Sequence, residues 1–451
     1  MDAFALMSQV GGVAGSIASF LVVLGVVVSV HEFGHYIVAR WCGIDAEVFS
    51  IGFGKEIWGW NDRRGTRWRL AVLPLGGYVK FVGDGDAASA RADTAGLEAM
   101  DDATRARSFP GAALWKRALA VAAGPGFNFI LSILIYAGLT MALGVGSERP
   151  VLGASQAQGA ETFPLRPGDE ILAVAGTGVT TFADISKAYD AASTAEPGRS
   201  LFPVDLRRDG REMTLETGPA IPPLVGSVAP ASPAEEAGLM AGDRIVQADG
   251  QPVGAFSDLQ RVVFGSDGAS VALVVEGTDG DRREVTLTPK LNPVPSADGG
   301  IEMRPLIGVS AVPLIAPEVV TPGVGQALGN GVTRTWQVIH SSLAYVGAII
   351  GGEADSSGLG GPIRIASLSG DAAGAGIVAF LGMIAMISTS IGMINLFPIP
   401  VLDGGHLMFY AFEAVRGRPL GDRATEAATG VGLALVLGLM VLVTFNDLMS
   451  L

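Results

Sequence analysis

Four long apolar runs, separated by polar stretches, dominate the pattern of the chain. A helix needs about 20 residues to cross a bilayer, and the runs cover residues 11–30, 118–143, 372–395 and 430–444. The last run is short, but its flanking residues can complete a span. The first run differs from a secretory signal peptide, because no positive residues precede it and no small-residue cleavage site follows it. We therefore expect four transmembrane helices, with the first one retained.

Positive residues near the ends of the runs predict the orientation, because loops rich in Lys and Arg stay on the cytoplasmic side. The first and third connections carry them, at Arg40, Lys116, Arg117, Arg416, Arg418 and Arg423. We expect these two connections to be cytoplasmic. Both termini and the long middle region, about 145–371, should then lie outside.

The first connection begins with alternating apolar and polar residues. Residues 46–60 and 66–83 flank the turn-like sequence NDRRG, which predicts a β-hairpin on the cytoplasmic side. Several tryptophans favour association with the membrane interface, although a small soluble β element has the same alternation. The polar, small-residue stretch 83–106 is typical of a flexible loop.

An internal repeat organises the middle region. Residues 165–176 (LRPGDEILAVAG) match residues 239–250 (LMAGDRIVQADG) at Leu, Gly, Asp, Ile and Gly. A helical stretch and a late strand follow each copy, so we expect two mixed β/α modules, which resemble circularly permuted PDZ domains. Such domains bind a peptide by adding it to a sheet edge. The loop 152–164 departs from that pattern, so a size filter without a bound peptide is the alternative.

The remaining middle segment, 323–350, has helical spacing and predicts an amphipathic helix on the outer membrane face. The predicted fold is thus a polytopic α-helical membrane protein with a cytoplasmic-side β-hairpin loop and two periplasmic PDZ modules. The expected parts are 1–41 (first span), 42–117 (hairpin loop), 118–144 (second span), 145–220 and 221–291 (two PDZ modules), 292–371 (linker with amphipathic helix), 372–425 (third span and Asp-Gly motif) and 426–451 (fourth span).

Composition agrees with this division. Of 451 residues, 49% are hydrophobic and only 16% are charged, whereas soluble domains carry about 25% charged residues. The formal net charge of −14 argues against a nucleic-acid partner. The single cysteine, Cys42, excludes an intramolecular disulfide.

The candidate chemistry lies at the end of the first run, in the sequence HEFGH at 31–35. On a helix, His31 and His35 lie one turn and about 40° apart, so both imidazoles can bind one zinc ion. Glu32 lies beside them as a candidate general base. The motif is short, but ionisable residues in a membrane span are usually functional. The alternative is a histidine pair satisfied by backbone carbonyls.

Catalytic zinc usually has three protein ligands, so a third should come from a distant segment at similar depth. Asp403, just after the third run and followed by Gly404, is the preferred candidate. His406 is the rival, since a third imidazole would also bind zinc.

HEFGH, together with Asn395-x-x-Pro398 and Asp403-Gly404, resembles the site-2 protease family of intramembrane zinc metalloproteases. The order of spans and modules extends the resemblance over nearly the whole chain. It implies one zinc ion per chain held by His31, His35 and Asp403, with Glu32 as catalytic base. The resemblance also implies residues that line the substrate path, namely Asn395, Pro398, Pro400 and, from the sequence GPGFN, Asn128. A simple Gly/Pro kink in the second span is the alternative for the last motif.

The resemblance implies cleavage within the transmembrane segment of single-span proteins. The expected substrates are anti-sigma factors already trimmed on their outer side, in the regulated proteolysis of an envelope stress response. Membrane lipid would surround the site, and the modules would bind periplasmic peptide or exclude untrimmed substrates. The alternatives are a membrane PDZ scaffold with a vestigial metal site and a zinc-dependent transporter, which usually has repeated spans that this chain lacks.

Overall fold

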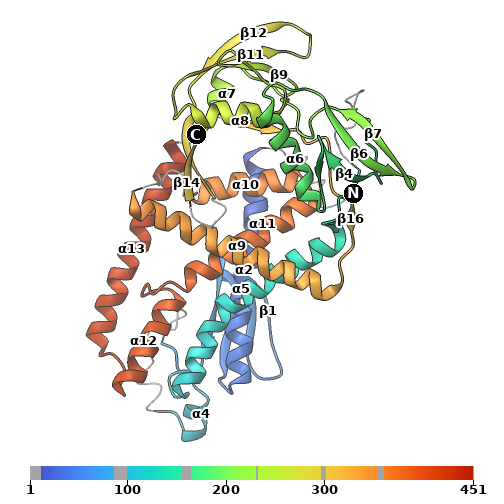
Figure 1. Cartoon of the computed structure of the whole chain (residues 1–451). Helices are drawn as coiled ribbons and strands as arrows, with labels where there is room; N and C mark the ends of the chain where they lie inside the picture. Colours follow the sequence, from blue (N-terminus) through green and yellow to red (C-terminus); the bar gives the residue numbers. More distant parts are fainter. Residues whose placement is uncertain are drawn as a thin grey trace. The chain divides into compact units, whose positions relative to one another are not determined.

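The computed structural model describes residues 12–85, 99–154, 164–229, 232–295, 301–352 and 360–449 (Figure 1). The chain forms two compact units. The first joins Met1–Met141 to Gly323–Leu451, and the second is Ala142–Pro322. The residues before the first run, most of the predicted binding loop 152–164 and part of the predicted loop 83–106 lie outside the described residues.

Four helices of the first unit are long and apolar enough to cross a membrane, as predicted. They are α2 (Val13–Trp41), α5 (Leu114–Leu143), α11 (Ile377–Asn395) and α13 (Asp422–Met449). The chain is therefore a polytopic membrane protein. A short helix, α4 (Asp102–Ala106), lies in the first connection.

Helices α2 and α5 lie side by side at very short range (Figure 1). A Cβ added to Gly34 would lie 2.5 Å from the carbonyl oxygen of Ala123, so only glycine permits this approach. Small residues serve the same purpose in other membrane helix pairs. On another side, Val23 and Val27 of α2 pack with Phe380 of α11 in a buried apolar cluster. Helix α2 is thus held from two directions, which fixes the histidines that it carries.

The predicted hairpin is present as β1 (Ala46–Asn61) and β2 (Arg67–Phe81), but its pairing is more complex. Residues 46–51 pair with residues 77–81, and the two segments run in opposite directions. Residues 48–51 also pair with residues 67–70, and along this pairing the residue numbers of both segments increase together. Residues 56–61 pair with 67–71 on the far side. Each strand is bent, so the two strands form four paired segments, with 77–81 at one edge.

Besides the third and fourth spans, the described residues of the carboxyl-terminal part of the first unit form three further helices. These are α9 (Val324–Gly351), α10 (Pro362–Gly374) and α12 (Asp403–Arg416). The third span begins later than predicted, because the chain breaks at Gly376, whose φ of 107° ends the preceding helix. Helix α12 is separated from α11 by a short loop, so Asp403 stands at a helix start.

The two repeated segments of the second unit form sheets with the same strand order. The first contains β4 (Glu170–Val174), β5 (Thr177–Gly178), β6 (Phe202–Arg208) and β7 (Arg211–Thr217), with α6 (Phe182–Ala195). The second contains β9 (Arg244–Ala248), β10 (Gln251–Pro252), β11 (Val271–Glu276) and β12 (Arg282–Leu287), with α8 (Phe256–Gly265). Each sheet has its own buried apolar core.

Shorter elements complete the second unit. They are α7 (Pro233–Glu236) and three strand pairs: β3 (Val145–Gly146) with β16 (Val319–Val320), β8 (Val225–Val228) with β15 (Val309–Ala311), and β13 (Lys290–Pro295) with β14 (Ile301–Leu306). The core of the second sheet includes Ile307, and that of the first includes Ile315. Both cores therefore draw on residues beyond position 291, where the second module was expected to end.

Asp258 joins the two modules. It lies in the first turn of α8, its side chain is almost fully buried, and it accepts a hydrogen bond from Ser193 of α6 at 2.8 Å. It also accepts bonds from the backbone amides of Gly254 and Ala255 and pairs with Arg261. Burial raises the pKa of this carboxyl, but these hydrogen bonds outweigh burial and hold the pKa below its usual value.

Replacing Asp258 by alanine is expected to destabilise the contact between the modules by about 2–3 kcal/mol, because a charged acceptor is lost and its donors stay buried. A lowered pKa means that the ionised carboxylate stabilises the folded state above pH ~4 and that this stabilisation disappears as the pH falls further. Hydrogen exchange of the full chain, followed by mass spectrometry, should show faster exchange in α6 and α8. Unchanged exchange in both helices would contradict this role.

Candidate active site

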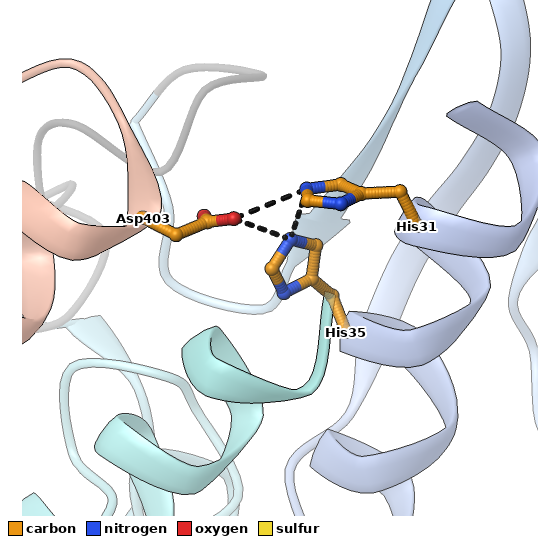
Figure 2. Close-up of side chains that lie close together, drawn as sticks. All are labelled: His31, His35 and Asp403. Carbon is orange, nitrogen blue, oxygen red and sulfur yellow. Dashed lines mark hydrogen bonds and ion pairs between the residues drawn. The ribbon is translucent and has the colours of Figure 1, made fainter. Parts of the chain in front are cut away.

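Three side chains from two distant segments of the first unit meet at one point (Figure 2). The Nε2 atoms of His31 and His35 lie 3.2 Å apart, and Asp403 Oδ2 lies 3.1 Å from the first and 3.5 Å from the second. His31 and His35 lie one turn apart on α2, and Asp403 begins α12. The structure thus brings together the three residues that the sequence proposed as ligands.

Both imidazoles are held through their other ring nitrogen. His35 Nδ1 donates to the carbonyl oxygen of Ala120 at 2.9 Å, and His31 Nδ1 lies 3.2 Å from the Asn128 side-chain amide. Asn128 Oδ1 is buried with no hydrogen-bond partner among the described residues. A half turn of the amide group places this oxygen where it accepts a hydrogen bond from His31 Nδ1–H. Both rings then present Nε2 to the shared point, as metal-binding histidines do.

Glycine at position 124 makes room for this arrangement. A Cβ added there would lie 2.3 Å from His35 Nε2 and 2.9 Å from His31 Nε2, the two atoms that face Asp403. Helix α5 can therefore contact both rings only because residue 124 has no side chain.

The donor set suits a zinc ion. Two imidazole nitrogens and one carboxylate oxygen lie within 4.8 Å of one another, and zinc catalytic sites commonly combine these ligand types while keeping a position open. Asp403 Oδ2 is buried and receives no hydrogen bond from any described residue, although it faces both rings. A bound cation would satisfy this oxygen.

A cavity of about 320 Å³ lies against the three residues. Its walls come from α2, β1, β2, α5, α11, α12 and the loops before α5 and α12. The lining residues are His31, Glu32, His35, Phe53, Gly77, Tyr78, Val79, Phe81, Phe109, Val121, Asn395, Val401, Asp403, His406 and Tyr410. Glu32 is packed against the edge segment of β2, since a Cβ added to Gly77 would lie 3.2 Å from Glu32 Cγ. The general-base candidate therefore faces the same space as the metal-ligand candidates.

The other predicted site residues do not all lie at the cavity. Asn395 lines the cavity, and its Nδ2 donates to the Ile391 carbonyl. Asn128 contacts His31 instead of the cavity, and Pro398 and Pro400 are not among its lining residues. Their predicted contact with substrate stays a prediction. The rival ligand His406 lines the cavity but is outside the three-residue group.

Several residues that line the cavity were not predicted from the sequence. Phe109 and Tyr410 have no motif around them, and only the fold brings them to the site. The edge residues Gly77 and Val79 carried a usable signal, because the alternating pattern already predicted a strand there. Gly124 was part of the quoted GPGFN motif, but its steric role depends on the position of α2.

Comparison with known proteins agrees with this geometry. The family model for peptidase family M50 matches residues 19–439, nearly the whole chain. The chain belongs to peptidase family M50. The resemblance to site-2 proteases is thereby confirmed, and this M50 member is a zinc-dependent metalloendopeptidase.

Named relatives of this M50 peptidase cover almost all of it. An Agrobacterium fabrum protein, Atu1380, whose name assigns it provisionally to the zinc metalloproteases, is 38% identical over 99% of both chains. The regulator of sigma-E protease RseP of Escherichia coli is 36% identical over 96% of this chain and 98% of its own. RseP of Salmonella typhimurium (strain 14028s) is also 36% identical, over 96% of this chain and 98% of its own.

Proposed function

We propose that this M50 peptidase cuts single-span membrane proteins within their transmembrane segments, with His31, His35 and Asp403 as zinc ligands and Glu32 as the catalytic base. The main support is the meeting of these residues at a cavity whose walls include three helices able to cross a membrane. A peptidase site at such a place gives access to peptide bonds that soluble proteases do not reach.

The chemistry follows from the residues around the cavity. Zinc, when bound, supplies a Lewis acid that polarises the scissile carbonyl and makes water acidic enough to attack at neutral pH. The Glu32 carboxylate accepts a proton from the attacking water and delivers it to the leaving nitrogen. Ala120 and Asn128 hold the imidazoles in the orientation that presents Nε2.

The edge of β2 offers a place for an extended substrate. Peptide bonds inside a helix are already hydrogen-bonded, so a transmembrane substrate must unwind before attack. Residues 77–81 pair with β1 on one side only, and Gly77, Tyr78 and Val79 line the cavity on the other. An unwound substrate adds to this edge as a further strand. The loop after α11, with Asn395, Pro398 and Pro400, would line its path.

The second unit would control access as two PDZ modules. A groove of about 110 Å³ lies between α8 and residues 305–309, which is where a PDZ domain holds a peptide. We assign this groove to peptide binding, with size exclusion of untrimmed substrates as the alternative. The bacterial relatives named RseP support placement in a bacterial inner membrane. The distribution of Lys and Arg predicts that the modules and both termini lie in the periplasm.

The relatives named RseP suggest the substrate class. Their name refers to regulation of sigma-E, which supports an anti-sigma factor, trimmed on its outer side, as the natural substrate of this chain in an envelope stress response. A membrane scaffold without peptidase activity has no specific support in the site, because all four candidate catalytic residues are in place.

Cleavage of a model substrate tests the proposal. The full chain in liposomes, mixed with a single-span protein that has a short outer segment, is expected to cut it inside the apolar segment, as located by mass spectrometry. Removing the metal with 1,10-phenanthroline should reduce cleavage to background, and added zinc should restore it. Cleavage only outside the apolar segment, or cleavage unaffected by the chelator, would overturn the proposal.

A further inference from the structure

We propose that Arg117 is a positioning residue of the active site: it fixes helix α12 against α5 and so holds Asp403 beside the two histidines. The inference rests on the proposed metal site and adds a residue to it that lies outside the ligand set and outside the catalytic cavity. It is carried by contacts of α12 and by the spacing of residues along α5.

Little of helix α12 is buried against the rest of the unit. Among its described residues, only Gly404 and Gly405 are buried, and both are in its first turn. Added Cβ atoms there would lie 2.3 Å from carbonyl oxygens of the preceding loop, so the start of α12 is tightly seated. Beyond Tyr410, every residue to Arg416 is exposed except Glu413.

Arg117 contacts this second half of α12 in two ways. Its Nη2 atom lies 2.7 Å from Glu413 Oε1, and the side chains of Arg117 and Glu413 are only 17% and 18% exposed. Its guanidinium also lies over the Tyr410 ring, 5.1 Å from the centroid. A largely buried arginine that is both paired and stacked is held more firmly than an exposed one, and lysine cannot reproduce the planar stacking. Arg117, Tyr410 and Glu413 together form the clamp of α12.

The clamp acts on the same face of α12 that carries the ligand. Asp403, Tyr410 and Glu413 are separated by seven and then three residues, which places them along one stripe of a helix. At 1.5 Å per residue, Glu413 lies about 15 Å along the axis from Asp403. The helix is therefore seated at its start and clamped near its end, which fixes its direction.

Arg117 also belongs to a stripe of α5 that serves the two histidines. Ala120 accepts from His35, Gly124 gives both rings room, and Asn128 contacts His31. Positions 117, 120, 124 and 128 follow helical spacing on one face. One face of α5 thus orients all three candidate ligands: two through contacts with the rings, and Asp403 through the clamp.

Metal binding by the full chain in detergent tests this role. Arg117→Ala is expected to lower the affinity for Co²⁺, measured from its visible absorption, by about tenfold or more, the range found for residues that orient metal ligands. Arg117→Lys should recover little of it, because lysine lacks the planar stacking group. The exchanged pair Arg117→Glu with Glu413→Arg should recover more than either single change.

Two controls separate a role of the clamp from a general loss of the metal site. Arg67→Ala removes an ion pair with Glu56 in the same unit but away from α12, and it should leave Co²⁺ affinity unchanged. If Arg117→Ala binds Co²⁺ like the unaltered chain, the clamp is refuted while the metal site stands. If the unaltered chain and a His31→Ala, His35→Ala variant bind Co²⁺ equally, the proposed metal site itself is refuted.

Discussion

Replacing Glu32 by glutamine is expected to reduce cleavage by about 10²–10⁴-fold, the usual contribution of a positioned general acid–base group. Glutamine keeps the size of the side chain, so its packing against Gly77 should persist. The amide cannot accept the proton of the attacking water, and the reaction loses its base. Turnover of a single-span substrate in liposomes, measured at saturating substrate, gives the effect.

The same variant should still bind one zinc ion per chain, because Glu32 is outside the three-residue ligand group. Metal content therefore separates loss of the base from loss of the site. A Glu32→Gln protein that retains zinc and cleaves at the original rate would exclude Glu32 as the base. A protein that loses both would show that Glu32 is needed for the site to form.

Replacing Gly124 by alanine is expected to weaken zinc binding by about 100-fold, the upper end of the range for disturbed ligand orientation, and to reduce cleavage with it. The added methyl group would lie 2.3 Å from His35 Nε2 and 2.9 Å from His31 Nε2, closer than nonbonded atoms approach. The rings must turn away, which moves their Nε2 atoms from Asp403 and breaks the spacing that the metal needs. Zinc content after dialysis and Co²⁺ titration both report the change.

Gly126→Ala is the matched control. It lies two residues further along α5, and an added Cβ there meets nothing within 4 Å. Both substitutions have the same effect on helix propensity, so any difference comes from the contact with the rings. Equal zinc affinity for the two variants would show that α5 does not confine the histidines.

The four spans and the histidine pair could be predicted because each depends on local sequence. A run of apolar residues is enough to predict a membrane helix, and the spacing of His31 and His35 places both on one helix face whatever surrounds them. Asp403 could be predicted as a candidate ligand because it follows an apolar run and precedes two glycines. The tertiary structure adds the distances that turn these residues into one site.

Other features depend on contacts between distant segments. Alternation predicted strands at 46–60 and 66–83, but not that each strand bends and pairs twice. The partners of Gly124 are on another helix, so its sequence context alone could not reveal why a side chain is excluded. Arg117 looked like a positive residue that marks a cytoplasmic loop, and only its contact with Glu413 shows a second role.

The chain order of the first unit has a consequence for biosynthesis. The second unit, Ala142–Pro322, interrupts the first, so the ribosome makes the histidines and the whole second unit before it makes Asp403. A nascent or truncated chain holds two of the proposed ligands and the proposed base but lacks Asp403 and the α12 half of the clamp. The newborn protein therefore cannot assemble the proposed metal site until the whole second unit has been synthesised.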